Sequence, residues 1–274
     1  MGNVSERRKQ PPQVGVSVVI LALGPVPQSD VGAGAASSGM GSTLWMPLVK
    51  RVRQPFLGQW ALPRGGLRAD HSLEQSAYAA LESTTSLHPK YLEQLYTFGD
   101  PARSHGGLPM VSIVYWALVG EADGRIDFAG GDNVKWFPVN HLPELAFDHR
   151  TIVEYAMNRL RGKIESPDIA TRLVGERFTL SQLHDVYEAI AGQRIDLANF
   201  RRKMLASGLL EDTGEKLRIG RNRPAAVYRD SPEVRLVVER AGGVLPVQPE
   251  AGNGFVDRSR NGIRIGRHSN CFPG

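Results

Sequence analysis

The sequence has almost no cysteine and no long apolar run. Its single cysteine, Cys271, cannot form a disulfide within the chain, and a cluster of cysteine ligands for a metal ion is excluded. The longest apolar run, residues 14–23, is too short to span a bilayer, and no apolar signal segment follows Met1. We therefore expect a cytoplasmic protein with no membrane partner.

Neither sign of charge dominates, because 33 lysines and arginines face 28 acidic residues, which leaves a net charge of +5. Such a balance is compatible with nucleic acid or anionic ligands, but where the charges cluster matters more. The 274 residues, 41% of them hydrophobic, suggest about two packed domains. Composition places the boundaries at a loose N-terminus (residues 1–13), a first domain (14–162), a second domain (163–240) and a disordered tail (241–274).

The first domain alternates strand and helix patterns. Apolar and β-branched runs predict strands at residues 14–23, 44–53, 111–119 and 136–139. Amphipathic spacing predicts helices at residues 72–87 and 151–161. Ser72 and Gln75 have the spacing of a capping box. One face of the helix is shared by Leu73, Ala77, Ala80, Leu81 and Thr84. The mixture predicts an α+β domain.

The segment from Leu62 to Gly66 and the helix after it resemble a Nudix box, in which a glycine turn precedes a helix that carries glutamates. The glutamate positions of that family fall here on His71, Ala80, Ser83 and Thr84. Nudix hydrolysis uses Mg²⁺ or Mn²⁺, and such hard cations need oxygen ligands, chiefly carboxylates. We therefore expect no catalytic residues, no metal site and no required cofactor. The simpler alternative is an ordinary amphipathic helix after a glycine turn.

A second segment, Phe98 to Arg103 followed by the strand at residues 111–119, is similar to ADP-ribose-type Nudix domains, which carry Gly-Asp-Pro-x-Arg before such a strand. The resemblance implies an effector site for ADP-ribose or a related NAD-derived molecule, and residues 104–108 depart from the family pattern. The candidate effector-binding residues are Arg64 and Arg103, as clamps for a diphosphate, and Trp60 and Tyr115, as stacking partners. The two aromatic residues are equally compatible with an ordinary core.

The second domain has the order helix, turn, helix, hairpin. Thr179 and Gln182 form another capping-box pair, and Asp196 is a suitable N-cap for the next helix. That helix is expected to bury Leu197, Phe200, Met204 and Leu205. Short strands are predicted at residues 209–211, 217–219 and 226–228. This order predicts a winged helix-turn-helix domain.

Basic side chains gather on the exposed parts of this domain. A helical wheel places Asn199, Arg202 and Lys203 outward, where Asn and Arg suit base edges in the major groove. Between residues 216 and 229 there are five basic residues and no acidic one. The wing candidates for phosphate contacts are Lys216, Arg218, Arg221 and Arg223. Arg201 lies nearer the buried edge, where an ion pair is as good an interpretation as a DNA contact.

Both halves together resemble the NrtR family of Nudix-related transcriptional regulators from residue 14 to residue 230. The resemblance implies an α/β/α Nudix fold with a mixed sheet, followed by a winged helix-turn-helix domain. It also implies a repressor of NAD-metabolism genes that responds to ADP-ribose and associates with the nucleoid when bound to DNA. A palindromic operator implies a homodimer. Two alternatives stay open: an ADP-ribose pyrophosphohydrolase with an appended domain, and a constitutive DNA-binding protein whose Nudix domain only dimerises.

Overall fold

The computed structural model describes residues 12–27, 41–89, 91–104, 109–120, 123, 125–164, 167–218 and 223–232. Residues 1–11 of the predicted N-terminus, residues 105–108, the wing candidate Arg221 and the predicted tail at 241–274 lie outside these ranges. Within the described part, no helix is long and apolar enough to cross a membrane.

Among the described residues, seven strands form one mixed sheet in the first domain. The strand β1 (Gln13–Pro25) lies at its centre and pairs in parallel with β6 (Met110–Val119). The order is β3-β2-β1-β6-β5, while β4 also pairs with β1 and β7 with β2. The remaining strands are β2 (Ser42–Lys50), β3 (Trp60–Ala61), β4 (Arg64–Gly66), β5 (Tyr91–Phe98) and β7 (Val134–Pro138).

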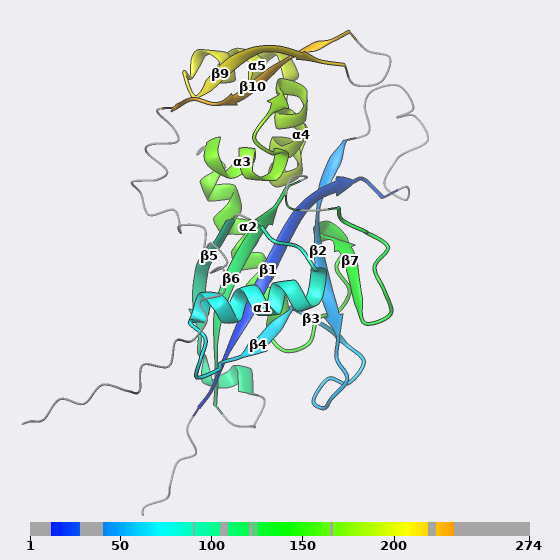
Figure 1. The fold of residues 1–274 in the computed structure, drawn as a ribbon. Coiled ribbons are helices and arrows are strands. Elements are labelled where there is room, and N and C mark those ends of the chain that lie inside the picture. The colour runs from blue at the N-terminus through cyan, green and yellow to red at the C-terminus, as the bar shows by residue number, and fades with distance from the viewer. Residues whose placement is uncertain are drawn as a thin grey trace, which may run out of the picture.

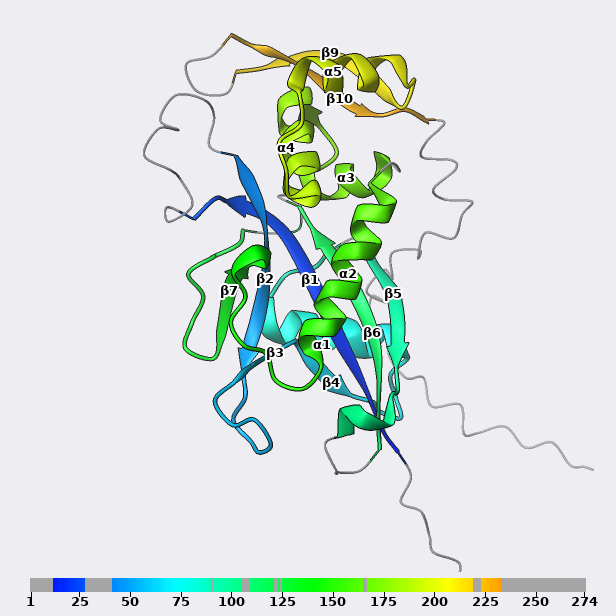
Figure 2. The ribbon, with the colours of Figure 1, turned by 180° about the vertical axis from the view of Figure 1, so that it is seen from behind.

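Helices cover both faces of this sheet, so the predicted α/β/α arrangement is confirmed (Figures 1 and 2). The helix α1 (Leu73–Thr85) lies on one face and α2 (His149–Lys163) on the other. Side chains along β1 alternate between the two faces of the sheet. Val16, Val18 and Ile20 pack toward α1. Val19 and Leu21 pack toward α2. The sheet is therefore buried on both sides at its centre.

The start of α1 follows the sequence pattern closely. The Ser72 hydroxyl accepts the Gln75 N–H at 3.1 Å, and the Gln75 side chain accepts the Ser72 N–H at 2.7 Å. The predicted capping box is thus confirmed. On the predicted shared face, Ala77, Ala80 and Leu81 are buried, whereas Leu73, the first residue of the helix, is 37% exposed.

The second domain is the expected winged helix, drawn at the top of Figure 1. It contains α3 (Pro167–Val174), β8 (Phe178–Thr179), α4 (Leu180–Ala191), α5 (Leu197–Ala206), β9 (Leu210–Leu217) and β10 (Ala225–Asp230). The three strands pair in the order β8-β10-β9. The capping pair Thr179–Gln182 and the N-cap Asp196 are present as predicted.

The buried face of α5 is narrower than the sequence suggested. Phe200 and Met204 are each 5% exposed and pack against α4, as predicted. Leu197 and Leu205 are 37% and 56% exposed, so their prediction as core residues is wrong. Only the side of α5 that carries Phe200 and Met204 packs against α4, and side chains next to that side reach solvent.

The two domains share one apolar core. Val19 and Trp116 in the sheet, Leu160 in α2, and Leu183 and Phe200 in the winged helix all belong to one cluster of buried residues. A polar contact crosses the same junction, because Arg161 Nε in α2 donates to the carbonyl of Ile190 in α4 at 3.3 Å. The winged helix is therefore packed on the sheet domain rather than tethered to it.

Gly120, at the end of β6, permits this packing. A Cβ built there would lie 2.8 Å from the carbonyl oxygen of Arg172 in α3, and a backbone atom cannot easily give way. Gly162 in α2 offers a matched control, because a Cβ at that position meets nothing within 4 Å.

We expect Gly120→Ala to lower the free energy of unfolding by about 1–3 kcal/mol through this clash. Gly162→Ala is expected to raise it by about 0.5–1 kcal/mol, because alanine favours a helix interior. Urea denaturation of the two variants measures both effects. Equal effects of the two substitutions would contradict the tight junction at Gly120.

Candidate functional site

Two adjoining cavities open where β1 begins, one of about 340 Å³ and one of about 790 Å³. We call the pair the basic groove. The residues that line both cavities are Gln13, Arg64, Arg103, Met110 and Phe147. The groove thus brings together Arg64 from β4 and Arg103 from the 3-10 turn Pro101–Ser104, the two arginines predicted as diphosphate clamps.

Positive charge dominates the groove. Among the described residues, the larger cavity is lined by five cationic residues, Lys50, Arg51, Arg53, Arg64 and Arg103, and by no acidic one. The described lining of the smaller cavity has one acidic residue, Asp148. Burial and the nearby charge of Arg64 lower the pKa of Arg51 from its ordinary value. A ligand that fits such a lining is an anion.

Three of these cations were not identified from the sequence. Lys50, Arg51 and Arg53 lie at the end of β2 and in the segment that follows it, and no motif surrounds them. Arg51 is held in place, because Nε donates to the carbonyl of Pro55 at 2.9 Å and its guanidinium lies 4.5 Å from the centre of the Phe147 ring. Within the described residues, the side chains of Arg53 and Arg64 have no hydrogen-bonding or ionic partner, so both are available to a ligand.

Arg103 is not free in the way the sequence suggested. Its Nε and Nη2 donate to the two carboxylate oxygens of Asp148, each at 2.9 Å, and Nη1 donates to the carbonyl of Phe98 at 2.6 Å. The Arg103 side chain is 4% exposed. Arg103, the predicted diphosphate clamp, is thus a buried arginine at the wall of the groove whose charge is already paired within the protein.

His149 lies beside this pair as the first residue of α2. Its Nδ1 accepts the N–H of Leu62 at 3.0 Å, so the proton of the neutral ring is on Nε2. Burial, together with the charges of Arg103, Arg64 and Arg51, lowers the pKa of His149 to about 4. The imidazole is neutral at physiological pH.

The positions where the Nudix family carries its paired glutamates are part of the same groove. Ser83 and Thr84 line the larger cavity, but their hydroxyls both donate to the carbonyl of Ala80, at 3.0 and 2.7 Å. Two hydroxyls engaged with their own helix, next to an arginine-rich wall, do not fit Mg²⁺ or Mn²⁺, which need carboxylate oxygens. The described lining of the larger cavity offers positive charges and N–H groups, which suit an anion and not a metal cation.

The two predicted stacking residues lie elsewhere. Tyr115 is 4% exposed and packs in the apolar cluster under α1, on the opposite face of the sheet from Asp148 and His149. Trp60 packs edge-on against Phe137, with ring centres 5.0 Å apart. Neither residue lines the groove. Both are therefore reassigned to packing, which is the alternative that the sequence left open.

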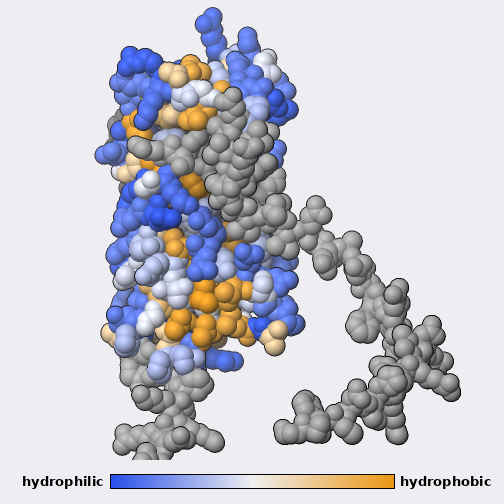
Figure 3. Space-filling view, turned by 90° about the vertical axis from the view of Figure 1, so that its left-hand side faces the viewer, coloured by the Kyte–Doolittle hydropathy of each residue, from blue (hydrophilic) through white to orange (hydrophobic). Residues whose placement is uncertain are grey.

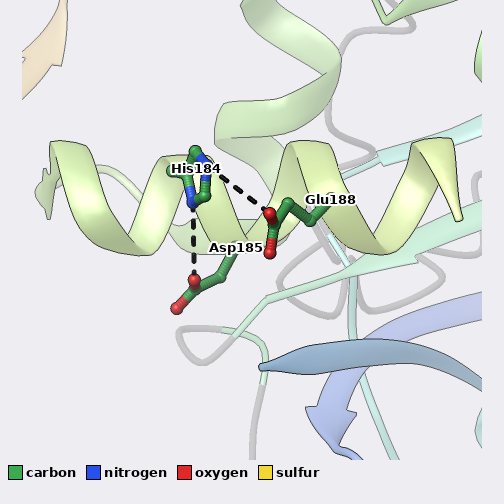
Figure 4. A group of neighbouring side chains, drawn as sticks. All are labelled: His184, Asp185 and Glu188. Atoms are coloured by element: carbon green, nitrogen blue, oxygen red, sulfur yellow. Dashed lines mark ion pairs between the residues drawn. The ribbon is translucent and has the colours of Figure 1, made fainter. Parts of the chain in front are cut away.

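Among the described residues there is one cluster of metal-ligating types: His184, Asp185 and Glu188 on α4 (Figure 4). His184 Nε2 donates to the carbonyl of Ile195 at 2.8 Å, and Glu188 accepts the N–H of the same residue at 2.8 Å. Burial raises the pKa of Asp185. Because two of the three groups already hold the turn before α5, we interpret the cluster as a clamp on that turn.

The predicted DNA-binding residues lie on the surface of the winged helix. Asn199, Arg202 and Lys203 are exposed on α5, and Arg202 Nη2 donates to Asn199 Oδ1 at 2.7 Å. Arg201 donates to the Ser181 hydroxyl at 3.1 Å, a contact between helices in place of the ion pair considered from the sequence. In the wing, the exposed basic residues are Lys216, Arg218 and Arg223.

Figure 3 shows one flank of the molecule, where hydrophilic side chains cover most of the winged-helix end and apolar side chains gather lower down, over the sheet domain. The exposed Leu197, Leu205 and Leu217 are exceptions at the winged-helix end. A hydrophilic, basic surface around α5 and the wing is suited to the backbone and base edges of duplex DNA.

A Nudix-type sheet domain with a basic groove, packed on a winged helix, defines a two-domain regulator of the Nudix-related class. Residues 170–229 match the NrtR DNA-binding winged helix domain. Over 186 residues the chain is 31% identical to the ADPR responsive transcriptional repressor NtrR of Acinetobacter baylyi, which covers 66% of this chain and 74% of that protein.

The crystal structure of Shewanella oneidensis NrtR complexed with a 27mer DNA has a TM-score of 0.64, at 34% identity over 81% of this chain and 94% of that one. An ADP-ribose pyrophosphatase of Methanocaldococcus jannaschii is 32% identical over 118 residues, 42% of this chain and 67% of that protein. The chain belongs to the NrtR family of Nudix-related transcriptional regulators.

The burial of His149 predicts a pH-dependent stability. The pKa is about 4 in the folded protein and 6.5 in the reference state, so between these values the unfolded chain binds a proton that the folded chain does not. The free energy of unfolding therefore falls as the pH drops through this range, by about 2 kcal/mol at pH 5.

His149→Asn keeps an acceptor for the Leu62 N–H and removes the titrating group. We expect its loss of stability between pH 7 and pH 5 to be smaller than that of the wild type by this amount, as measured by urea denaturation at each pH. Parallel pH profiles of the two proteins would show that His149 does not titrate in this way.

Proposed function

We propose that this protein is a DNA-binding transcriptional repressor whose Nudix-type domain binds ADP-ribose or a related NAD-derived molecule. The observation that carries the proposal is the pairing of an arginine-rich, carboxylate-poor groove with an exposed basic α5 in one packed molecule. The relatives support it: one is named an ADPR responsive transcriptional repressor, and another was crystallised with a 27mer DNA.

The groove favours an effector with a diphosphate. Arg53 and Arg64 have free guanidinium groups and Arg51 keeps unused N–H donors, so three arginines face the larger cavity. Guanidinium groups bind phosphate oxygens in pairs, and no neighbouring carboxylate in this cavity competes for them. An unmetallated diphosphate is repelled by glutamates in an active Nudix box, whereas Ala80, Ser83 and Thr84 do not repel it.

We infer from the same residues that the protein is not an enzyme. Hydrolysis of a diphosphate by the Nudix mechanism depends on a metal held by carboxylates, and Ser83 and Thr84 stand where those carboxylates are needed. The alternative hypothesis is a hydrolase, and the similarity to an ADP-ribose pyrophosphatase supports it. Metal-dependent turnover of ADP-ribose by the purified protein would establish that alternative.

The DNA partner is proposed to be a palindromic operator bound by a homodimer, in which each subunit supplies one α5 to a major groove. By the family resemblance, the regulated genes are those of NAD metabolism. An effector that binds better to a dimer geometry unfit for both half-sites lowers DNA affinity, by no more than its preference between the two geometries.

The structure offers a direct route for this linkage. The helix α2 begins at the groove, where Asp148 and His149 line the smaller cavity, and at its other end Arg161 contacts the Ile190 carbonyl of α4. A helix moves as a stiff rod, so a displacement at its first turn also reaches the winged helix.

We expect ADP-ribose to bind in EDTA, without turnover, and to change the affinity for operator DNA. Arg64→Ala and Arg53→Ala should each weaken ADP-ribose binding by about tenfold or more, since each removes a charge-assisted contact. Arg159→Ala, an exposed arginine of α2 outside the groove, serves as the control and should leave the affinity unchanged. Calorimetry measures all four proteins.

If wild-type protein does not bind ADP-ribose at millimolar concentration, the sheet domain serves another ligand or only dimerisation. If the protein binds operator DNA with the same affinity whether or not ADP-ribose occupies the groove, the constitutive alternative is correct.

A second experiment separates base recognition from phosphate contacts. Asn199→Ala and Arg202→Ala should cost about 1–3 kcal/mol on operator DNA and much less on scrambled DNA, because base edges are read by such side chains. Arg218→Ala and Arg223→Ala should weaken both and flatten the salt dependence. Titrations at several salt concentrations provide the measurement. Sequence-independent losses in all four variants would contradict this division of roles.

A further inference from the structure

Asp148 occupies the N-cap position of α2 but does not cap the helix. No hydrogen bond joins its side chain to the first turn, and its backbone angles, φ −93° and ψ 19°, differ from the extended values at other caps. By contrast, Ser72, Thr179 and Asp196 each accept a backbone N–H of the helix they precede. At Asp148 both carboxylate oxygens are directed at Arg103 instead.

The Asp148 carboxylate therefore occupies an anion site within the groove. Arg103 lines both cavities, and Asp148 is the one acidic residue that the described part of the chain contributes to the lining of either. Arg64, which lines both cavities as well, has no carboxylate partner among the described residues. The position of strongest anion binding, a buried guanidinium with two parallel donors, is thus filled by a side chain of the protein itself.

We propose that Asp148 is an internal competitor of the effector, and that a phosphate group of the effector displaces it from Arg103. The inference rests on the proposed effector function of the groove. In the displaced arrangement Arg103 pairs with phosphate, and Asp148 turns back to accept N–H groups at the start of α2. Asp148 then determines both the affinity and the selectivity of the site.

The exchange leaves no buried charge without a partner. Arg103 is paired before and after it, first with a carboxylate and then with a phosphate, so the large penalty for an isolated buried cation does not arise. The released carboxylate moves to the N-terminus of α2, where unpaired N–H groups and the helix dipole stabilise a negative charge. Asp148 is 25% exposed, so it has room to rotate.

Competition with Asp148 also determines which anions can bind to Arg103. A single-atom anion such as chloride cannot replace a carboxylate that makes two parallel hydrogen bonds, whereas one phosphate of a diphosphate presents two free oxygens to Arg103 and the second phosphate adds a further negative charge for the neighbouring arginines. The site therefore disfavours chloride and favours the diphosphate class. The same step alters the first turn of α2, the helix whose far end contacts α4.

The test compares full-length wild type with Asp148→Asn, in which an amide keeps the capping ability and loses the charge that pairs with Arg103. Calorimetry in EDTA should show ADP-ribose binding about tenfold tighter, the equivalent of one hydrogen bond to a charged group. Inorganic pyrophosphate, weak on the wild type, should gain at least as much. Without effector, the affinity of the variant for operator DNA should shift toward the value of effector-loaded wild type.

Glu154→Gln is the matched control, because it removes an acidic charge from an exposed position on the same helix, outside both cavities, and should change neither measurement. In an Arg103→Ala background, Asp148→Asn should no longer tighten binding. A structure of the wild type with bound ADP-ribose provides a second readout that needs no variant: the Asp148 carboxylate should lie farther from Arg103 than the ion-pair limit of about 4 Å.

Weaker binding by Asp148→Asn, or an ion pair between Arg103 and Asp148 that persists in the liganded structure, would overturn the proposal. Both outcomes require that the wild type binds ADP-ribose. Absence of any binding to the wild type would instead refute the proposed effector, so the two failures are distinguishable.

Discussion

The buried ion pair between Arg103 and Asp148 is the contact on which the arrangement of the sheet domain around the groove depends. It joins the turn after β5 to the residue before α2, at the wall of the groove. Arg103 also donates to the Phe98 carbonyl, so one side chain fixes three segments. A buried pair of this kind is costly to break by removal of one partner, because the other charge is left buried and uncompensated. If the proposed exchange of Asp148 for a phosphate takes place, the contact that stabilises the empty groove is also the one that responds to the ligand.

A second contact beside the ion pair involves His149. His149, next to Asp148, stays neutral because of burial and the three nearby arginines, and so its Nδ1 remains an acceptor for the Leu62 N–H. This bond joins the start of α2 to Leu62, the first residue of the segment that resembles a Nudix box. This chain has the glycine turn and helix that resemble a Nudix box, while Ser83 and Thr84 donate their hydroxyls back to Ala80. The larger cavity beside them therefore suits an anion and not a metal cation.

The sequence predicted those elements whose pattern is local. The capping boxes at Ser72 and Thr179, the apolar strands and the order of the winged helix all depend on residues a few positions apart, and they are confirmed. The strand β5 was missed because a bulge between Gln94 and Tyr96 interrupts its alternation. The basic groove was found only in part: Arg51 and Arg53 reach it through tertiary folding, and the partner of Arg103 lies 45 residues away.

The contacts that α4 makes with the turn before α5 limit how α5 can move relative to α4. His184 and Glu188 bind both backbone groups of Ile195, and Phe200 packs between the two helices. These contacts restrict rotation of α5 about its own axis relative to α4. The hydrogen bond from Arg202 to Asn199 fixes these two side chains relative to each other. Under the proposed function, a displacement of the winged helix carries α5 with α4 as one rigid unit, which changes the affinity for an operator and leaves the preferred base sequence the same.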